Sequence, residues 1–281
     1  MKLTHDWDPA VLLQSPLFTP LQPVIQHLDS AVFPNLQDLN ALLAGHFHRI
    51  YVQDGLPLHF VPQEQGKLGF ESQYEPRCYL NGEVQTRENN WHDLFNALVW
   101  LSLPKAKAAI NRRHYQALTG IARQTSTDSA SSQRGKMRDM ATLLDESGVI
   151  IACSEKKLAE LLRTFKWKEL FWQRRVQLQA AMDFYVIGHG MYEKALNPYI
   201  GMTGQGLVVM VEQEFFNWPL SDRLAWLDRE VAAYLDNPEH CRSTRELHPV
   251  PLLGFPGWSD QNVHEDFYDN TAYFRTGRAR V

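Results

Sequence analysis

Two histidines and two carboxylates stand out because each pair lies within a segment that is otherwise apolar. His92 and Asp93 begin the stretch WHDLFNALVWLS, and His189 and Glu193 belong to DFYVIGHGMYEKAL. A buried polar group without a partner costs about 1–3 kcal/mol, so side chains in such segments must meet other polar groups or a ligand. We therefore expect the four side chains to converge on one partly buried pocket.

Imidazole and carboxylate groups placed together support two kinds of chemistry. His92, His189 and Glu193 are of the types that bind Zn²⁺ or a similar divalent metal. Without a metal, His189 could act as a general base that Glu193 orients, with His92 and Asp93 completing the catalytic cluster. The HxxxE spacing lacks the second histidine of HExxH, so the sequence leaves both alternatives open. A third interpretation is that both pairs only form buried hydrogen-bond clusters.

The elements that must position these residues are predicted to be helices. Asn90 is expected to cap a helix over 91–101, and Pro104 to begin the next one. Residues 155–196 read as mainly helical, with a break near Gly188. Glycines on both sides of His189 would let a ligand or another backbone segment approach closely. The site is therefore expected where the helices 90–101 and 181–196 meet.

Turn signals predict short antiparallel hairpins around this helical core. They are Asp54-Gly55, Asn81-Gly82 and the stretch 145–148, within the segments 48–88 and 138–153. The polar run 125–134 is predicted to be a flexible loop. No convincing linker divides the chain, so we expect one domain over residues 1–281. The expected fold class is α+β, a mainly helical single domain with short antiparallel β-hairpins.

Composition narrows the class of protein. Hydrophobic residues make up 44% of the chain and charged residues 21%, which is typical of an ordinary globular protein. The longest apolar runs, such as 149–153 and 207–211, fall far short of the roughly 20 residues that span a bilayer. No membrane segment and no secretion signal are therefore expected. Three widely spaced cysteines without a CxxC motif argue against a disulfide framework and favour a cytoplasmic protein.

The charge distribution suggests an alternative function. Residues 104–175 carry 15 basic and 7 acidic side chains, whereas the segments on both sides are acidic. Such a block could bind nucleic acid or another polyanion, although charge runs usually form solvated helix faces. The leading hypothesis is a pocket protein that binds a small molecule, as an enzyme of hydrolase type that uses the His/Asp/Glu site. The third hypothesis is a structural or interaction protein with no site.

Several blocks of the sequence resemble a bacterial family known as domain of unknown function 3025. They are residues 82–111, RDMATLLDESG, GHGMYEKAL, PLLGFPGWSDQN and FYDNTAYFR, in that order along the chain. The resemblance implies a single-domain protein and carries over no catalytic role. The positions here that match the polar pattern of the family are His92, Asp93, Asn96, Arg138, Asp139, Asp145, Glu146, His189, Glu193 and Asn262. Both polar groups described above therefore belong to that pattern.

Overall fold

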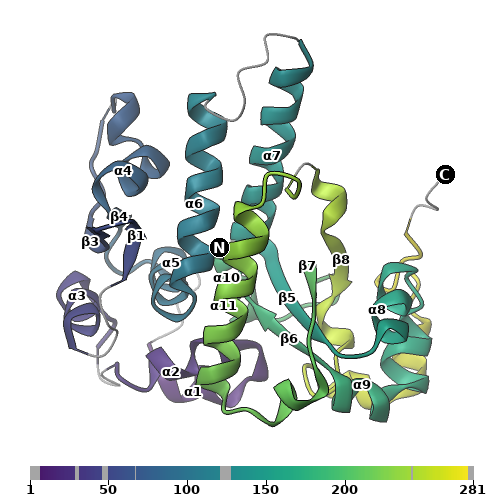
Figure 1. The fold of residues 1–281 in the computed structure, drawn as a ribbon. Coiled ribbons are helices and arrows are strands. Elements are labelled where there is room, and N and C mark those ends of the chain that lie inside the picture. The colour runs from purple at the N-terminus through teal and green to yellow at the C-terminus, as the bar shows by residue number, and fades with distance from the viewer. Residues whose placement is uncertain are drawn as a thin grey trace.

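The computed structural model describes residues 7–28, 32–45, 50–66, 68–120, 128–241 and 243–277 (Figure 1). Its α-helices are α1 (Pro9–Gln14), α2 (Gln22–Ile25), α3 (Leu36–Gly45), α4 (Tyr74–Asn81), α5 (Trp91–Ser102), α6 (Pro104–Thr119), α7 (Asp128–Ser147), α8 (Lys156–Arg163), α9 (Arg175–Ala181), α10 (His189–Ala195) and α11 (Leu220–Asp236). The fold is α+β and mainly helical, as the sequence predicted. Among the described residues, no helix combines the length and apolar character that crossing a membrane requires.

The largest sheet has four strands in the order β6-β5-β7-β8. These strands are β5 (Gly148–Cys153), β6 (Met182–Val186), β7 (Thr203–Met210) and β8 (His248–Pro251). β5 is antiparallel to β6 and parallel to β7, and all six of its residues are buried. In Figure 1 the sheet lies between α5, α6, α10 and α11 on one side and α8, α9 and the C-terminal segment on the other. Because both faces are covered, the central strand is continuously apolar.

Two small sheets and eight short helices complete the fold of the described residues. β1 (Tyr51–Gln53) and β2 (Leu56–Pro57) form an antiparallel pair, which confirms the turn predicted at Asp54-Gly55. β3 (His59–Pro62) and β4 (Glu83–Thr86) pair in parallel. The short helices are η1 (Pro16–Leu21), η2 (Phe70–Ser72), η3 (Glu169–Gln173), η4 (Gln213–Asn217), η5 (Thr244–Glu246), η6 (Leu252–Gly254), η7 (Asp260–Val263) and η8 (Glu265–Asp269).

The helices α5 and α6 begin where the sequence predicted. The side chain of Asn90 accepts a hydrogen bond from the backbone N–H of Asp93 and caps α5, nine of whose twelve residues are buried. Pro104 begins α6. Backbone N–H groups of that first turn, which have no partner within the helix, are satisfied by Asp228 of α11, which accepts from Lys105 at 3.1 Å and from Ala106 at 2.8 Å. This long-range cap fixes the start of α6 against α11.

The last turn of α7 runs directly into β5, and the start of α10 packs against that junction. The backbone N–H of Gly188 donates to the carbonyl of Gly148 at 2.9 Å. A Cβ at Gly188 would overlap the backbone of residues 146–148, so only glycine permits this approach. The glycine that the sequence assigned to a close approach therefore brings the first turn of α10 onto the C-terminal end of α7.

Three predictions of local structure are wrong, and a fourth is refined. The Asn-Gly pair at 81–82 ends α4, with Gly82 left-handed at φ 71°, instead of turning a hairpin. No hairpin forms over 138–153, because α7 continues to Ser147. The segment 155–196 is mainly helical as predicted, but its break is the strand β6, which ends just before Gly188. Of the predicted loop 125–134, the part from Asp128 onward is helical, and residues 125–127 lie outside the described residues.

Candidate functional site

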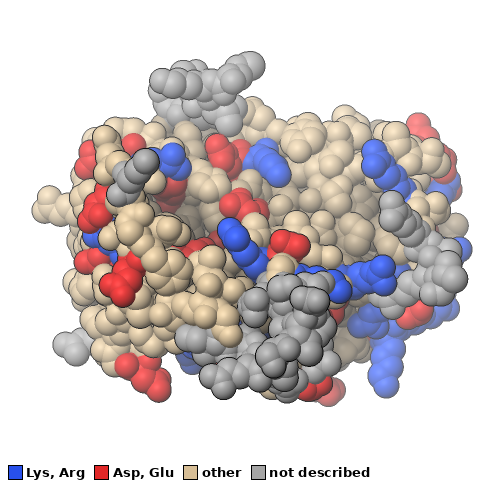
Figure 2. All heavy atoms as spheres, turned by 90° about the horizontal axis from the view of Figure 1, so that it is seen from above, with Lys and Arg blue, Asp and Glu red and all other residues tan. Residues whose placement is uncertain are grey.

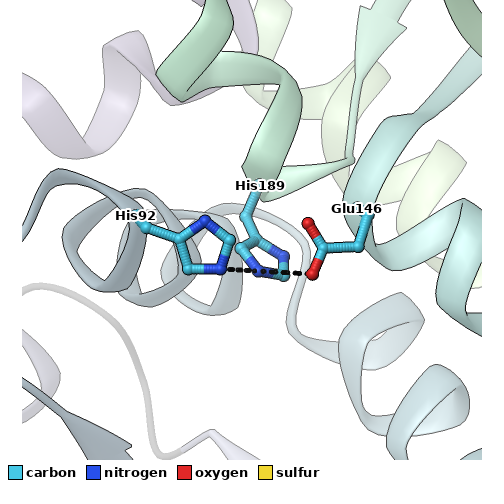
Figure 3. A group of neighbouring side chains, drawn as sticks. All are labelled: His92, Glu146 and His189. Atoms are coloured by element: carbon cyan, nitrogen blue, oxygen red, sulfur yellow. Dashed lines mark hydrogen bonds and ion pairs between the residues drawn. The ribbon is translucent and has the colours of Figure 1, made fainter. Parts of the chain in front are cut away.

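Three side chains from three helices meet where α5, α7 and α10 adjoin (Figure 3). His92 stands in the first turn of α5, Glu146 in the last turn of α7, and His189 is the first residue of α10. Their positions near helix ends follow from the Asn90 cap and from the glycine contact between α10 and α7. We call His92, Glu146 and His189 the central triad.

The ligand-type atoms of the central triad lie within 4.8 Å of one another. His92 Nε2 is 3.0 Å from His189 Nε2, and His189 Nε2 is 3.7 Å from Glu146 Oε1. Two ligands bound tetrahedrally at about 2.1 Å from a zinc ion would be about 3.4 Å apart. The two separations above lie on either side of that value, and the separation of His92 from Glu146 is at most 4.8 Å, so the triad can hold a small divalent ion after an adjustment of its side chains.

Each histidine turns its other ring nitrogen toward a carboxylate. His92 Nδ1 is hydrogen-bonded to Glu193 Oε2 at 3.1 Å, whereas His189 Nδ1 lies 3.5 Å from Asp145 Oδ2 and makes no hydrogen bond with the described residues. A carboxylate at Nδ1 favours the tautomer that carries its proton there, which leaves the Nε2 lone pair directed into the triad. Both rings are therefore oriented in the way that metal-ligating histidines usually are.

Burial sets the charges around the triad. It lowers the pKa of His189 to about 4, with Asp145 opposing and Lys107 reinforcing the shift, so this imidazole is neutral at pH 7. Burial alone would raise the pKa of Asp145, but the neighbouring Lys107 ammonium and His189 outweigh it and lower that pKa to about 2. Burial also raises the pKa of Glu146. The site thus combines a neutral ligand-type ring with an ionised carboxylate behind it.

A chain of buried polar groups holds the Asp145 carboxylate in place. The Lys107 side chain is 3% exposed, and its ammonium donates to Asp145 Oδ1 and, at 2.8 Å, to Asn96 Oδ1. The Asn96 amide donates in turn to the hydroxyl of Tyr74 at 2.6 Å. Nζ of Lys107 also lies 5.6 Å from the centre of the Trp100 ring. These contacts hold the carboxylate that orients His189.

The structure brings three of the four residues expected to form the pocket into one cluster. His92 and His189 face each other directly, and Glu193 joins them through His92, not through His189 as the sequence suggested. Glu193 therefore lies at the outer nitrogen of the His92 ring. Glu146 occupies the place beside the two Nε2 atoms that the sequence assigned to Glu193. The structure does not bring Asp93 into this group, since Arg87 binds its carboxylate with two side-chain bonds of 2.8 Å and a backbone N–H.

Sequence reasoning missed Glu146, Asp145 and Lys107 as parts of the site. The pair at 145–146 was assigned to a turn, and Lys107 was counted in the basic block. The available signal was the match of both acidic residues to the polar pattern of the family. No sequence signal distinguished Lys107, because its burial depends on Asn96 of α5 and Asp145 of α7.

A pocket of about 150 Å³ adjoins the central triad. Glu146 of the triad and Asp145 form one end of it, and the other lining residues come from α4, α6 and α7. They are Glu75, His114, Leu118, Arg138 and Thr142. A small molecule in this pocket would therefore lie beside Glu146, the member of the central triad that lines it.

Many cations of the basic block 104–175 are paired within the fold. Arg112 contacts Asp236, Lys168 contacts Glu265 and Asp269, and Arg174 contacts Glu169. Arg113 is buried and donates to backbone carbonyls near the end of α11. These contacts explain part of the charge excess as intramolecular pairing. Binding of the block to nucleic acid stays a prediction.

Comparison with known proteins identifies a family. The model of a family described as "Protein of unknown function (DUF3025)" matches residues 58–278, which include the whole central triad. The chain belongs to this family. No curated protein and no solved structure matches it.

Proposed function

We propose that this protein is a metal-dependent enzyme of hydrolase type, in which His92, Glu146 and His189 hold one divalent ion. The observation that supports this most strongly is the orientation of the two rings. Both Nε2 atoms converge with a carboxylate, while each Nδ1 faces a second carboxylate. Two histidines and one glutamate form a known catalytic zinc ligand set, which leaves a fourth position open.

Each residue around the ion then has a distinct task. Glu193 holds the proton of His92 on Nδ1 through a hydrogen bond, and the negative charge of Asp145, 3.5 Å from Nδ1 of His189, favours a proton there as well, so both inner nitrogens stay available. Lys107 keeps Asp145 ionised, as described above. A divalent ion bound here would polarise a carbonyl or phosphoryl group and make a water molecule more acidic. The adjoining pocket would admit the substrate to that position.

Metal content of the full chain tests the proposal. The protein, purified without chelator and dialysed against Zn²⁺, should contain one ion per chain by elemental analysis. His92→Ala, His189→Ala and Glu146→Gln should each lose it, whereas Glu193→Gln should bind about 10–100-fold more weakly. His264→Ala is the matched control, because this exposed histidine lies outside the triad.

Two results would contradict the metal site. One is wild-type protein that stays folded and takes up no stoichiometric ion. The other is full metal content in all three triad variants. Either would favour the metal-free alternative, in which His92 and His189 form a hydrogen-bonded pair that transfers protons. We also propose a cytoplasmic location, which is supported by Cys78, Cys153 and Cys241 being buried free thiols.

A further inference from the structure

The pocket beside the central triad is lined along one side by a single stripe of α7. Arg138, Thr142 and Glu146 follow one another at intervals of four residues, which places them on the same helix face. Eight residues of helix span about 12 Å, so Arg138 stands at the opposite end of the pocket from the triad. Figure 2 shows the molecule from above, and acidic and basic side chains lie side by side on the face that it presents.

The carboxylates that line the pocket already have partners. Asp145 is paired with Lys107, and Glu146 belongs to the central triad. Glu75 accepts a hydrogen bond of 2.6 Å from the Asn111 amide and lies 3.9 Å from His114 Nε2. Lys107 thus compensates Asp145, the proposed ion would compensate Glu146, and burial raises the pKa of Glu75, which favours its neutral form.

Arg138 is the contrasting case. It is exposed, and it makes no hydrogen bond or ion pair with any residue in the described part of the chain. A guanidinium presents a planar fork of donors that matches the two oxygens of a carboxylate or a phosphate. Its unmatched charge therefore sets the electrostatic preference at this end of the pocket.

We propose that the substrate of this site carries an anionic group, a carboxylate or a phosphate, that binds Arg138 while its reactive bond lies at the central triad. The proposal rests on the proposed metal-dependent function. The volume of about 150 Å³ corresponds to about five water molecules of liquid, which suits a small acid or a terminal group of a longer molecule.

Three hydroxamates of increasing charge test this proposal by calorimetric titration of the zinc-loaded full chain. Acetohydroxamate can contact only the metal. Succinyl monohydroxamate adds a carboxylate, and phosphonoacetohydroxamate adds a phosphonate, so the two anionic probes separate the two sources of the anion. At least one of them should bind about tenfold more tightly than acetohydroxamate, as expected for one charge-assisted contact.

One arginine variant and one lysine variant of α7 identify the residue that binds the anionic group. Arg138→Gln should abolish the tenfold advantage and leave acetohydroxamate binding and zinc content unchanged. Lys136→Gln removes the same charge from an exposed position of the same helix outside the pocket lining, and should keep the advantage. Persistence of the advantage in Arg138→Gln, or equal binding of all three probes to the wild type, would overturn the anionic substrate while zinc content still supports the metal site. Failure of the wild type to bind zinc would overturn both proposals.

Discussion

Lys107 places its buried ammonium against Asp145, the carboxylate that faces the outer nitrogen of His189. The two partners are 38 residues apart, on α6 and α7, and both are largely buried. A buried charge is tolerated only when it is paired and hydrogen-bonded. The ion pair therefore links the packing of α6 against α7 to the orientation of a proposed metal ligand.

Removal of the Lys107 charge should destabilise the protein strongly. Lys107→Met leaves Asp145 buried without its partner, and we expect a loss of about 3–5 kcal/mol in the free energy of unfolding at pH 7. Urea denaturation followed by circular dichroism measures it. Lys105→Met, at an exposed position of the same helix, should change stability by less than about 0.5 kcal/mol.

The double variant Lys107→Met/Asp145→Asn separates charge from packing. It should recover part of the stability that Lys107→Met loses, because no uncompensated carboxylate remains. A double variant as unstable as the sum of both single variants would show that the two side chains contribute independently.

Gly190 should control the position of the Glu146 carboxylate. A Cβ at this position would overlap Glu146 Oε2, so Gly190→Ala must displace the carboxylate or the start of α10. We expect zinc affinity to fall at least about tenfold, since changes to groups that position a metal ligand typically lower metal affinity about 10–100-fold. Competition with a chelating dye gives the affinity.

Gly135→Ala is the control for that substitution. Gly135 lies on α7 with open space around it, so alanine there should leave zinc affinity unchanged and stabilise the helix by about 0.5–1 kcal/mol. Unchanged zinc affinity in Gly190→Ala as well would mean that Glu146 does not bind the ion.

The long-range cap of α6 should give stability a measurable pH dependence. Burial raises the pKa of Asp228 to about 6, against the opposing effect of the backbone N–H groups of Ala106 and Lys105. A folded-state pKa above the unfolded value of about 3.9 means that the folded protein holds the proton more tightly. Its contribution to stability is complete below pH 4 and is lost as the pH rises to about 6.

Asp228→Asn should remove this contribution. The difference in free energy of unfolding between wild type and variant should shift by about 2–3 kcal/mol between pH 4 and pH 7, to the disadvantage of the wild type at the higher pH. Denaturation at several pH values measures the shift. A difference that does not change with pH would show that Asp228 titrates normally.

The sequence predicted those parts of the site whose signals are local. The helix of His92 was recognisable from the Asn90 cap and an almost uninterrupted apolar run, and the two histidines were expected to meet because buried polar groups need partners. Glu146 was not expected there, since an acidic pair before glycine is typical of a turn as well as of a helix end. The residue after it, Ser147, is the last of α7.

Other features depended on tertiary contacts that no local pattern contains. No glycine or proline separates α9 from β6, so the sequence favoured one long helix, whereas pairing with β5 makes the segment extended. Lys107 belongs by sequence to a basic, apparently solvated block. Only the packing of α6 against α7 buries it beside Asp145 and Trp100.

The most direct test of the central claim is anomalous diffraction at the zinc edge from crystals grown with Zn²⁺. If the triad binds zinc, the map should show one strong peak about 2.0–2.2 Å from His92 Nε2, His189 Nε2 and a carboxylate oxygen of Glu146. A map with no peak between the two imidazoles, and with their Nε2 atoms still 3.0 Å apart in a direct hydrogen bond, would contradict it.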